Sequence, residues 1–201
     1  LAAKGGIVEY VARFEEVEGV LFRFDTRIYL GSYNQNKDSI CVGAMVGKNP
    51  GSAMPSSLGK LGPLELRSDK MLPTVGNRFT EAFALATKQV PPNAFVRIWN
   101  LFYVCGKDLN QAAKIASQLT HPPICESEKG TVPFVWFGWG GNNAMLNPFK
   151  NRFIDRNYSP AFFYDRTCSS VVSRAPRQSE FAKHTQGMPA DPITKYLSTV
   201  V

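Results

Sequence analysis

Alternating apolar and polar residues at positions 19–31 predict one strand or a hairpin near the start of the chain. Three continuous apolar runs follow, and each predicts a strand that is covered on both faces. These runs lie at residues 39–46, 94–104 and 132–139. A short fourth strand is expected at residues 180–185.

Helical patterns lie between these strands. Apolar residues at helical spacing predict a helix at residues 75–88, and Asp108 is placed to cap a second helix that ends near Leu119. The order strand, helix, strand, helix, strand predicts a three-layer α/β/α fold with a central, mainly parallel four-stranded sheet. A chain of 201 residues with 44% hydrophobic content is long enough to form one domain over residues 1–201.

Charge and cysteine content narrow the functional classes. The formal net charge of +7 favours polyanionic partners, and the basic excess is densest at residues 142–184. The four cysteines show no CxxC spacing, so we expect neither a metal nor another cofactor. No apolar run approaches membrane-spanning length and no leader pattern opens the chain, so we expect a soluble, cytoplasmic monomer with no membrane partner.

Polar residues on small or rigid turns mark three strand ends. They lie at residues 48–52, at Asn100 and at residues 140–143. Taken singly, each is explained by the turn-forming tendency of Asn and Gly. Ligands of parallel sheets bind outside the carboxyl ends of the strands, so the convergence of all three predicts a binding site at that edge.

Four segments carry a resemblance to the uracil-DNA glycosylase superfamily. The turn "GKNPGS" (residues 47–52) resembles the Gly-x-Asn-Pro-Gly motif of its mismatch-specific thymine/uracil branch. The strands "RIWNLF" and "FVWFGWGG" resemble its second and third motif strands, and "HTQGMPADP" (residues 184–192) stands where its last motif is expected. The chain also resembles a family of uncharacterised bacterial proteins with an Asn-Pro turn, an "NLF" strand and a C-terminal Gly-x-Pro-x-His-Pro segment. Asp191 stands where that second family has His.

The resemblance implies a catalytic set. Asn49 would place a water against the sugar cation that forms during base removal. His184 would donate to the leaving base or to a phosphate, and Asp191 occupies the other last-motif position. A solvated surface histidine is the alternative interpretation of His184.

The resemblance also implies a substrate pocket. Pro50 would stiffen the turn, and Gly51 would leave room for a base larger than uracil, such as a modified pyrimidine of foreign or phage DNA. Asn100 would bind the Watson–Crick edge of the base. Lys48, next to Asn49, could form a Schiff base, but a phosphate contact demands less of its position and is the preferred interpretation. The implied substrate-binding residues are Gly47, Lys48, Pro50, Gly51, Ser52 and Asn100, with Phe102 or Tyr103 stacking on the base.

DNA is the expected partner. Aromatic and basic residues interleave at residues 147–158, a composition typical of a loop that contacts phosphates and inserts into the base stack. The alternative is a loop whose aromatic residues pack on the sheet while its charges face solvent. The candidate DNA-binding residues are Lys150, Arg152, Arg156, Arg174, Arg177 and Lys183.

These observations favour a monofunctional DNA glycosylase that removes a non-standard base, in repair or in antiviral defence. Two alternatives remain open at this point. One is a nucleic-acid or nucleotide-binding module without catalysis. The other is an enzyme that acts on a free nucleoside or nucleotide, since one fold can serve several functions.

Overall fold

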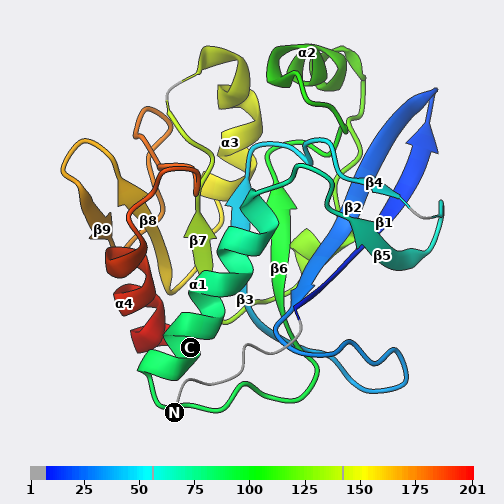
Figure 1. Cartoon of the computed structure of the whole chain (residues 1–201). Coiled ribbons are helices and arrows are strands. Elements are labelled where there is room, and N and C mark those ends of the chain that lie inside the picture. Colours follow the sequence, from blue (N-terminus) through cyan, green and yellow to red (C-terminus); the bar gives the residue numbers. More distant parts are fainter. Residues whose placement is uncertain (1–7, 56, 142) are drawn as a thin grey trace.

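The computed structural model describes residues 8–55, 57–141 and 143–201. A nine-stranded sheet forms its centre, in the order β4-β5-β1-β2-β6-β3-β7-β8-β9 (Figure 1). The strands are β1 (Glu9–Val17), β2 (Val20–Tyr29), β3 (Ile40–Gly47), β4 (Met54–Pro55), β5 (Leu61–Glu65), β6 (Ala94–Asn100), β7 (Val135–Phe137), β8 (Ala161–Asp165) and β9 (Ser170–Val172).

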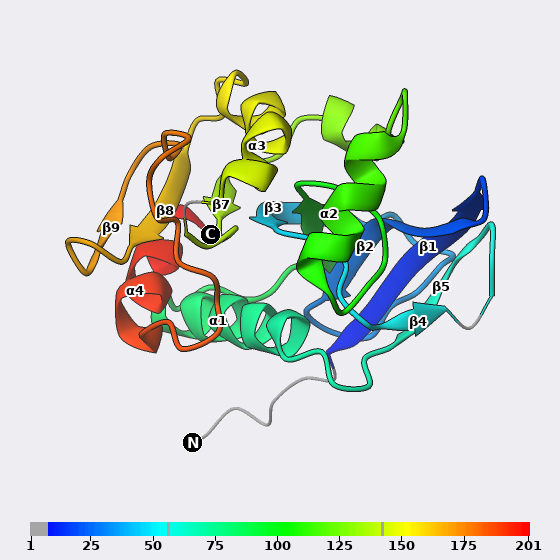
Figure 2. The same cartoon turned by 90° about the horizontal axis from the view of Figure 1, so that it is seen from above.

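Helices cover both faces of this sheet. They are α1 (Met71–Leu85), α2 (Leu109–Gln118), α3 (Asn147–Ile154) and α4 (Ala190–Val200), with short 3-10 helices η1 (Glu126–Lys129) and η2 (Ala144–Leu146). Seen from above, α1 and α4 lie on one side of the sheet and α2 and α3 on the other (Figure 2). Each side has its own apolar core, so the chain buries both faces of the central strands.

The prediction of a mixed α/β fold is confirmed, but the sheet differs from the predicted one. It has nine strands instead of four, and five of its eight strand pairings are antiparallel. The parallel pairings join β6 to β3, β3 to β7, and β7 to β8. The β1–β2 hairpin, extended by β5 and β4, adds one antiparallel edge, and β9 adds the other.

The apolar patterns located most of the central elements. The predicted strands at residues 39–46, 94–104 and 132–139 correspond to β3, β6 and β7. The strand or hairpin predicted at residues 19–31 is the single strand β2, and its hairpin partner β1 lies before the predicted range. Asp108 caps α2 as expected, because its carboxylate accepts hydrogen bonds from the backbone N–H groups of Asn110 and Gln111. The predicted helix at 75–88 corresponds to α1.

The predicted strand at residues 180–185 is wrong. Only Ala182 makes bridges there, to Gly140 and to Asp165, and these two contacts do not form a ladder. The strand that pairs with β7 on its other side is β8 (Ala161–Asp165), which was not among the predicted strands. Within the part of the chain that the structure describes, no helix is both long and apolar enough to cross a bilayer.

Candidate functional site

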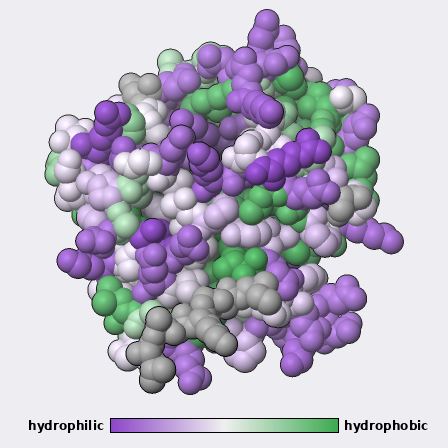
Figure 3. Space-filling view, in the orientation of Figure 1, coloured by the Kyte–Doolittle hydropathy of each residue, from purple (hydrophilic) through white to green (hydrophobic). Residues whose placement is uncertain are grey.

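A cavity of about 800 Å³ opens at the carboxyl end of β3, beside the first turn of α1. Its walls come from the turn after β3, the residues before α1 and the segment before α4, together with residues that precede and begin α2. The lining residues are 48–52, 68–71 and 184–188, with Thr74, Lys107 and Leu109. On the face drawn in Figure 3, hydrophilic side chains predominate and apolar patches are small.

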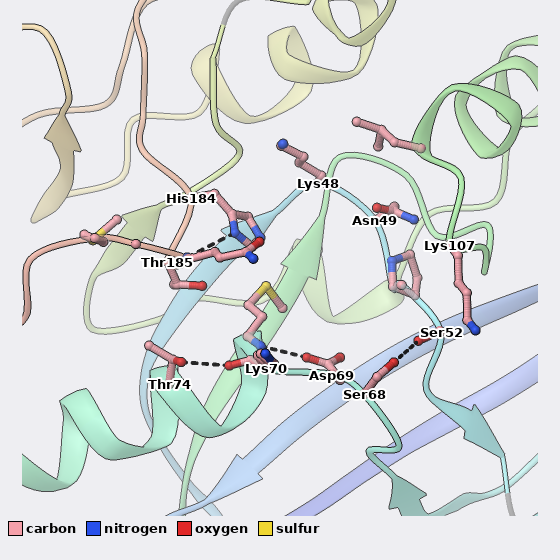
Figure 4. A pocket seen from close by; sticks show the side chains of 17 residues that line it. Lys48, Asn49, Ser52, Ser68, Asp69, Lys70, Thr74, Lys107, His184 and Thr185 are labelled. Atoms are coloured by element: carbon pink, nitrogen blue, oxygen red, sulfur yellow. Dashed lines mark hydrogen bonds between the residues drawn. The ribbon is translucent and has the colours of Figure 1, made fainter.

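The predicted turn aims Asn49 into this cavity. The Nδ2 of Asn49 donates to the backbone oxygen of Gly106 at 2.9 Å, which fixes the orientation of the amide. The Oδ1 of Asn49 therefore remains an acceptor, and it points away from that hydrogen bond (Figure 4). Pro50 is buried, and Gly51 holds a φ of +70°, a conformation that glycine adopts without strain.

His184 lines the same cavity, although it lies 135 positions further along the chain (Figure 4). The backbone N–H of Gln186 donates to its Nδ1 at 3.3 Å, so the neutral imidazole carries its proton on Nε2. Burial, together with the nearby Lys48 ammonium, lowers the pKa of His184 to about 4. At neutral pH this side chain is therefore an uncharged N–H donor.

The lowered pKa makes protein stability depend on pH. An unfolded histidine, with a pKa of about 6.5, takes up a proton before the folded one does. Between pH 6.5 and 4 the unfolded state therefore binds more protons, and the free energy of unfolding falls as pH falls. We expect His184→Gln to remove a slope of up to about 1.4 kcal/mol per pH unit in urea-unfolding measurements over this window. Parallel pH curves for the two proteins would contradict this assignment.

Asn100 lies behind the wall of the cavity at the end of β6. Its side chain is fully buried, and neither amide atom has a hydrogen-bond partner among the described residues. A Cβ at Gly47 would lie 3.2 Å from Asn100 Oδ1 and 3.3 Å from Met71 Sδ. Met71 lines the cavity, whereas Asn100 and Gly47 do not. An unsatisfied buried amide next to a cavity is costly unless a ligand or water supplies the missing hydrogen bonds.

Phe102 and Tyr103 are not placed to stack on a base in the cavity, contrary to the prediction. Both side chains are buried in the core on the α2–α3 side of the sheet, and neither lines the cavity. Phe102 packs against Phe149, with 5.2 Å between ring centroids, and the Tyr103 hydroxyl donates to Glu128. Both residues follow the end of β6 at Asn100, where the chain packs their rings into this core instead of the cavity.

Asp191 also lies outside the cavity. It is exposed in the first turn of α4, where a carboxylate is favourable for the helix dipole. Lys48 does line the cavity, and burial lowers the pKa of its ammonium. A Cβ at Gly140 would lie 2.6 Å from Lys48 Cε, so glycine at position 140 makes room for this lysine. The neighbouring Asn142 lies outside the described residues.

The basic segment at residues 147–158 is not the predicted loop, because Asn147–Ile154 form helix α3. The cationic groups of Lys150 and Arg152 on this helix, and of Arg156 just after it, bind groups within the protein. Lys150 is fully buried, and its Nζ donates to Asn147 Oδ1 and to the Gln178 backbone oxygen. Arg152 pairs with the buried carboxylate of Glu128 at 2.9 Å, and Arg156 donates to the Glu128 backbone oxygen at 2.6 Å.

The remaining candidate DNA contacts are spread outside the cavity. Arg174 forms two hydrogen bonds with the carboxylate of Glu180, at 2.7 and 2.6 Å. Arg177 is exposed and Lys183 is partly buried, and neither lines the cavity. For Arg177 and Lys183, DNA contact stays a prediction.

Sequence reasoning missed the residues that precede α1 and α2. Asp69 and Lys70 line the cavity from one side, and Lys107 lines it from another (Figure 4). Among the described residues, no acidic group forms an ion pair with Lys48, Lys70 or Lys107. The sequence carried no signal for this cluster, because its members come from three separate turns.

Comparisons with protein-family models, with curated proteins and with solved structures found no match to this chain. The geometry of the cavity is therefore the basis for assigning a function. It brings together six of the predicted site residues, namely Lys48, Asn49, Pro50, Gly51, Ser52 and His184.

Proposed function

We propose that the protein is a DNA glycosylase of the uracil-DNA glycosylase type, which hydrolyses the bond between deoxyribose and a base larger than uracil. The observation that carries the proposal is the meeting of Asn49 and His184 in one cavity at the carboxyl end of β3. One offers an acceptor for a water, and the other offers a neutral N–H donor. The parallel pairings that join β6, β3, β7 and β8 within the nine-stranded sheet support the proposal, because the cavity opens at their carboxyl edge.

The reaction needs these two groups on opposite sides of the scissile bond. The bond between C1′ and the base nitrogen breaks, and its electron pair goes to the base. The Nε2–H of His184 stabilises the negative charge that develops on the base. Asn49 Oδ1 holds a water whose oxygen adds to C1′, and one proton of that water balances the base anion. The products are the free base and an abasic sugar.

Base recognition rests on the amide of Asn100. One amide offers both a donor and an acceptor, which matches the edge of a pyrimidine. The lack of a partner for either atom supports this role, although Asn100 is fully buried and does not line the cavity. A bound base would have to displace cavity-lining side chains to reach it.

The phosphates of DNA would be bound by lysines at the cavity. Lys70 and Lys107 are exposed, Lys48 is partly buried, and their ammonium groups have no acidic partner among the described residues. The hydroxyls of Ser52 and Ser68, 3.3 Å apart, add further donors. This cluster takes the place of the α3 residues, whose charges are already bound within the protein.

The proposal is tested by incubating the protein with duplex and single-stranded DNAs that carry different modified pyrimidines. Alkali cleavage detects abasic sites, and mass spectrometry identifies the released base. We expect release of a modified pyrimidine and weaker activity on uracil. Salt-dependent DNA binding without base release would instead indicate a binding module, and release from free nucleosides alone would indicate a nucleoside hydrolase.

The size of the base pocket is tested at Gly51. A Cβ at this position would meet no heavy atom within 4 Å, so a larger side chain projects into open space. We expect Gly51→Tyr to abolish release of a large modified pyrimidine while activity on uracil survives or rises, because the ring fills the space of the base substituent. Relative rates on the two substrates measure this effect.

A backbone control is needed because φ at Gly51 is +70°. Tyrosine is strained in this conformation, whereas asparagine tolerates it better. Gly51→Asn should therefore keep the substrate preference of the unmodified protein. Equal loss of activity on both substrates in Gly51→Tyr and Gly51→Asn would show that glycine is needed here for the backbone conformation. The residue would then not set the size of the base that fits.

A further inference from the structure

Asp69 brings a carboxylate to the wall of the cavity. Its side chain is 8% exposed, and its Oδ1 accepts hydrogen bonds from the backbone N–H groups of Met71 and Leu72 at 2.9 and 3.2 Å. These bonds fix the carboxylate at the start of α1. Its Oδ2 has no hydrogen bond to a described residue, and its nearest charged partner is Arg23 Nη1 at 3.9 Å.

Arg23 lies behind Asp69 and does not line the cavity. Its side chain is fully buried on β2, and all three guanidinium nitrogens lack hydrogen-bond partners among the described residues. A buried guanidinium without a compensating negative charge is strongly unfavourable. Asp69 is the acidic residue that pairs with it. A cation in the cavity therefore lies closer to the Asp69 carboxylate than to the Arg23 guanidinium.

The cavity lining carries groups of both charges. Figure 4 shows Lys48 and His184 on one side, while Asp69 lies on the other side near Ser68, next to Lys70. Lys48 is close enough to His184 to lower the pKa of the imidazole. Among the described residues that line the cavity, Asp69 is the one acidic side chain.

During base removal the base becomes negative and the sugar becomes positive, so a carboxylate at the cavity wall can stabilise the sugar. We propose that Asp69 is a second catalytic residue, which stabilises the cationic sugar while Lys48 and His184 stabilise the departing base. The assignment deepens the proposed function and rests on it. Asn49 is uncharged, so Asp69 supplies the negative charge that the turn after β3 lacks.

The test measures binding to two DNAs that differ at one residue. One carries a pyrrolidine in place of the sugar, which is cationic at neutral pH, and the other carries the neutral tetrahydrofuran analogue. We expect the unmodified protein to bind the cationic DNA more tightly. Asp69→Asn should reduce this preference by about tenfold, since one nearby charge interaction is lost. The neutral DNA should bind both proteins alike.

The substitution is chosen to keep the fold. The asparagine Oδ1 can still accept hydrogen bonds from Met71 and Leu72. If the unpaired Arg23 prevents folding, the double variant Arg23→Met/Asp69→Asn removes both charges and serves instead. Asp191→Asn is the matched control, because Asp191 is exposed and lies outside the cavity.

The outcomes separate the two proposals. A preference for the cationic DNA that falls in Asp69→Asn and persists in Asp191→Asn supports the role of Asp69. Equal binding of the two DNAs by the unmodified protein, or an unchanged preference in Asp69→Asn, overturns that role and leaves glycosylase activity to be judged by base release. Failure of the unmodified protein to bind either DNA overturns both proposals.

Discussion

Replacement of Asn49 by alanine is expected to slow base release by about a hundredfold or more, the usual cost of losing one positioned catalytic group. The side chain faces a cavity, and its Oδ1 is free to hold a water. DNA affinity should change little, because the amide addresses water and not phosphate. Single-turnover rates on the best modified substrate, with affinity measured in parallel, give the comparison.

The hydrogen bond from Asn49 to Gly106 requires a control. Alanine removes this bond as well as the catalytic acceptor, so a shift of the turn would also lower the rate. Asn49→Asp keeps an acceptor for water, but its carboxylate cannot donate to the Gly106 oxygen. If the alanine variant is slow only because it lacks the hydrogen bond to Gly106, both variants should lose activity equally. A faster aspartate variant would indicate general-base help to the water, and near-normal rates in the alanine variant would remove Asn49 from the mechanism.

Much of the cavity could be predicted from local sequence. The apolar run of β3 ends at Gly47, and the rigid turn that follows must lie at the carboxyl edge of the sheet. The parallel pairing of Gly47 with Asn100 brings the end of β6 to the same edge. These relations follow from strand patterns and from the geometry of parallel sheets.

Other parts of the site depend on contacts that no local pattern encodes. Asp69 belongs to a turn before α1, and its role depends on a charge on β2 that lies 46 positions earlier. The sequence of α3 gives no sign that its basic side chains have acidic partners. In the structure, the buried carboxylate of Glu128 from η1 pairs with Arg152. A basic residue next to aromatic residues has the same composition whether it contacts DNA or an internal carboxylate. The sequence therefore could not distinguish these two cases.

Removal of charge at Arg152 is expected to lower protein stability, whereas removal of charge at a cavity lysine is expected to weaken the salt dependence of DNA binding. Arg152 forms two hydrogen bonds with the Glu128 carboxylate, at 2.9 and 3.2 Å, and a third with the backbone oxygen of Asn100 at 3.0 Å. Glu128 is 2% exposed, so Arg152→Met leaves a buried carboxylate with fewer partners. Breaking a buried ion pair costs about 3–5 kcal/mol, and the lower end applies because Arg156 and Tyr103 still contact Glu128.

A loss of about 3 kcal/mol corresponds to a fall of roughly 6–12 °C in Tm for a chain of this size. The salt dependence of DNA affinity should stay unchanged in Arg152→Met, since this guanidinium is already bound within the protein. Lys70→Met and Lys107→Met should leave Tm unchanged, because both side chains are exposed without an acidic partner among the described residues. Each should lower the slope of log affinity against log salt by about 0.9 on duplex DNA. A lowered slope in Arg152→Met at constant Tm would return the DNA interface to α3 and contradict its placement at the cavity.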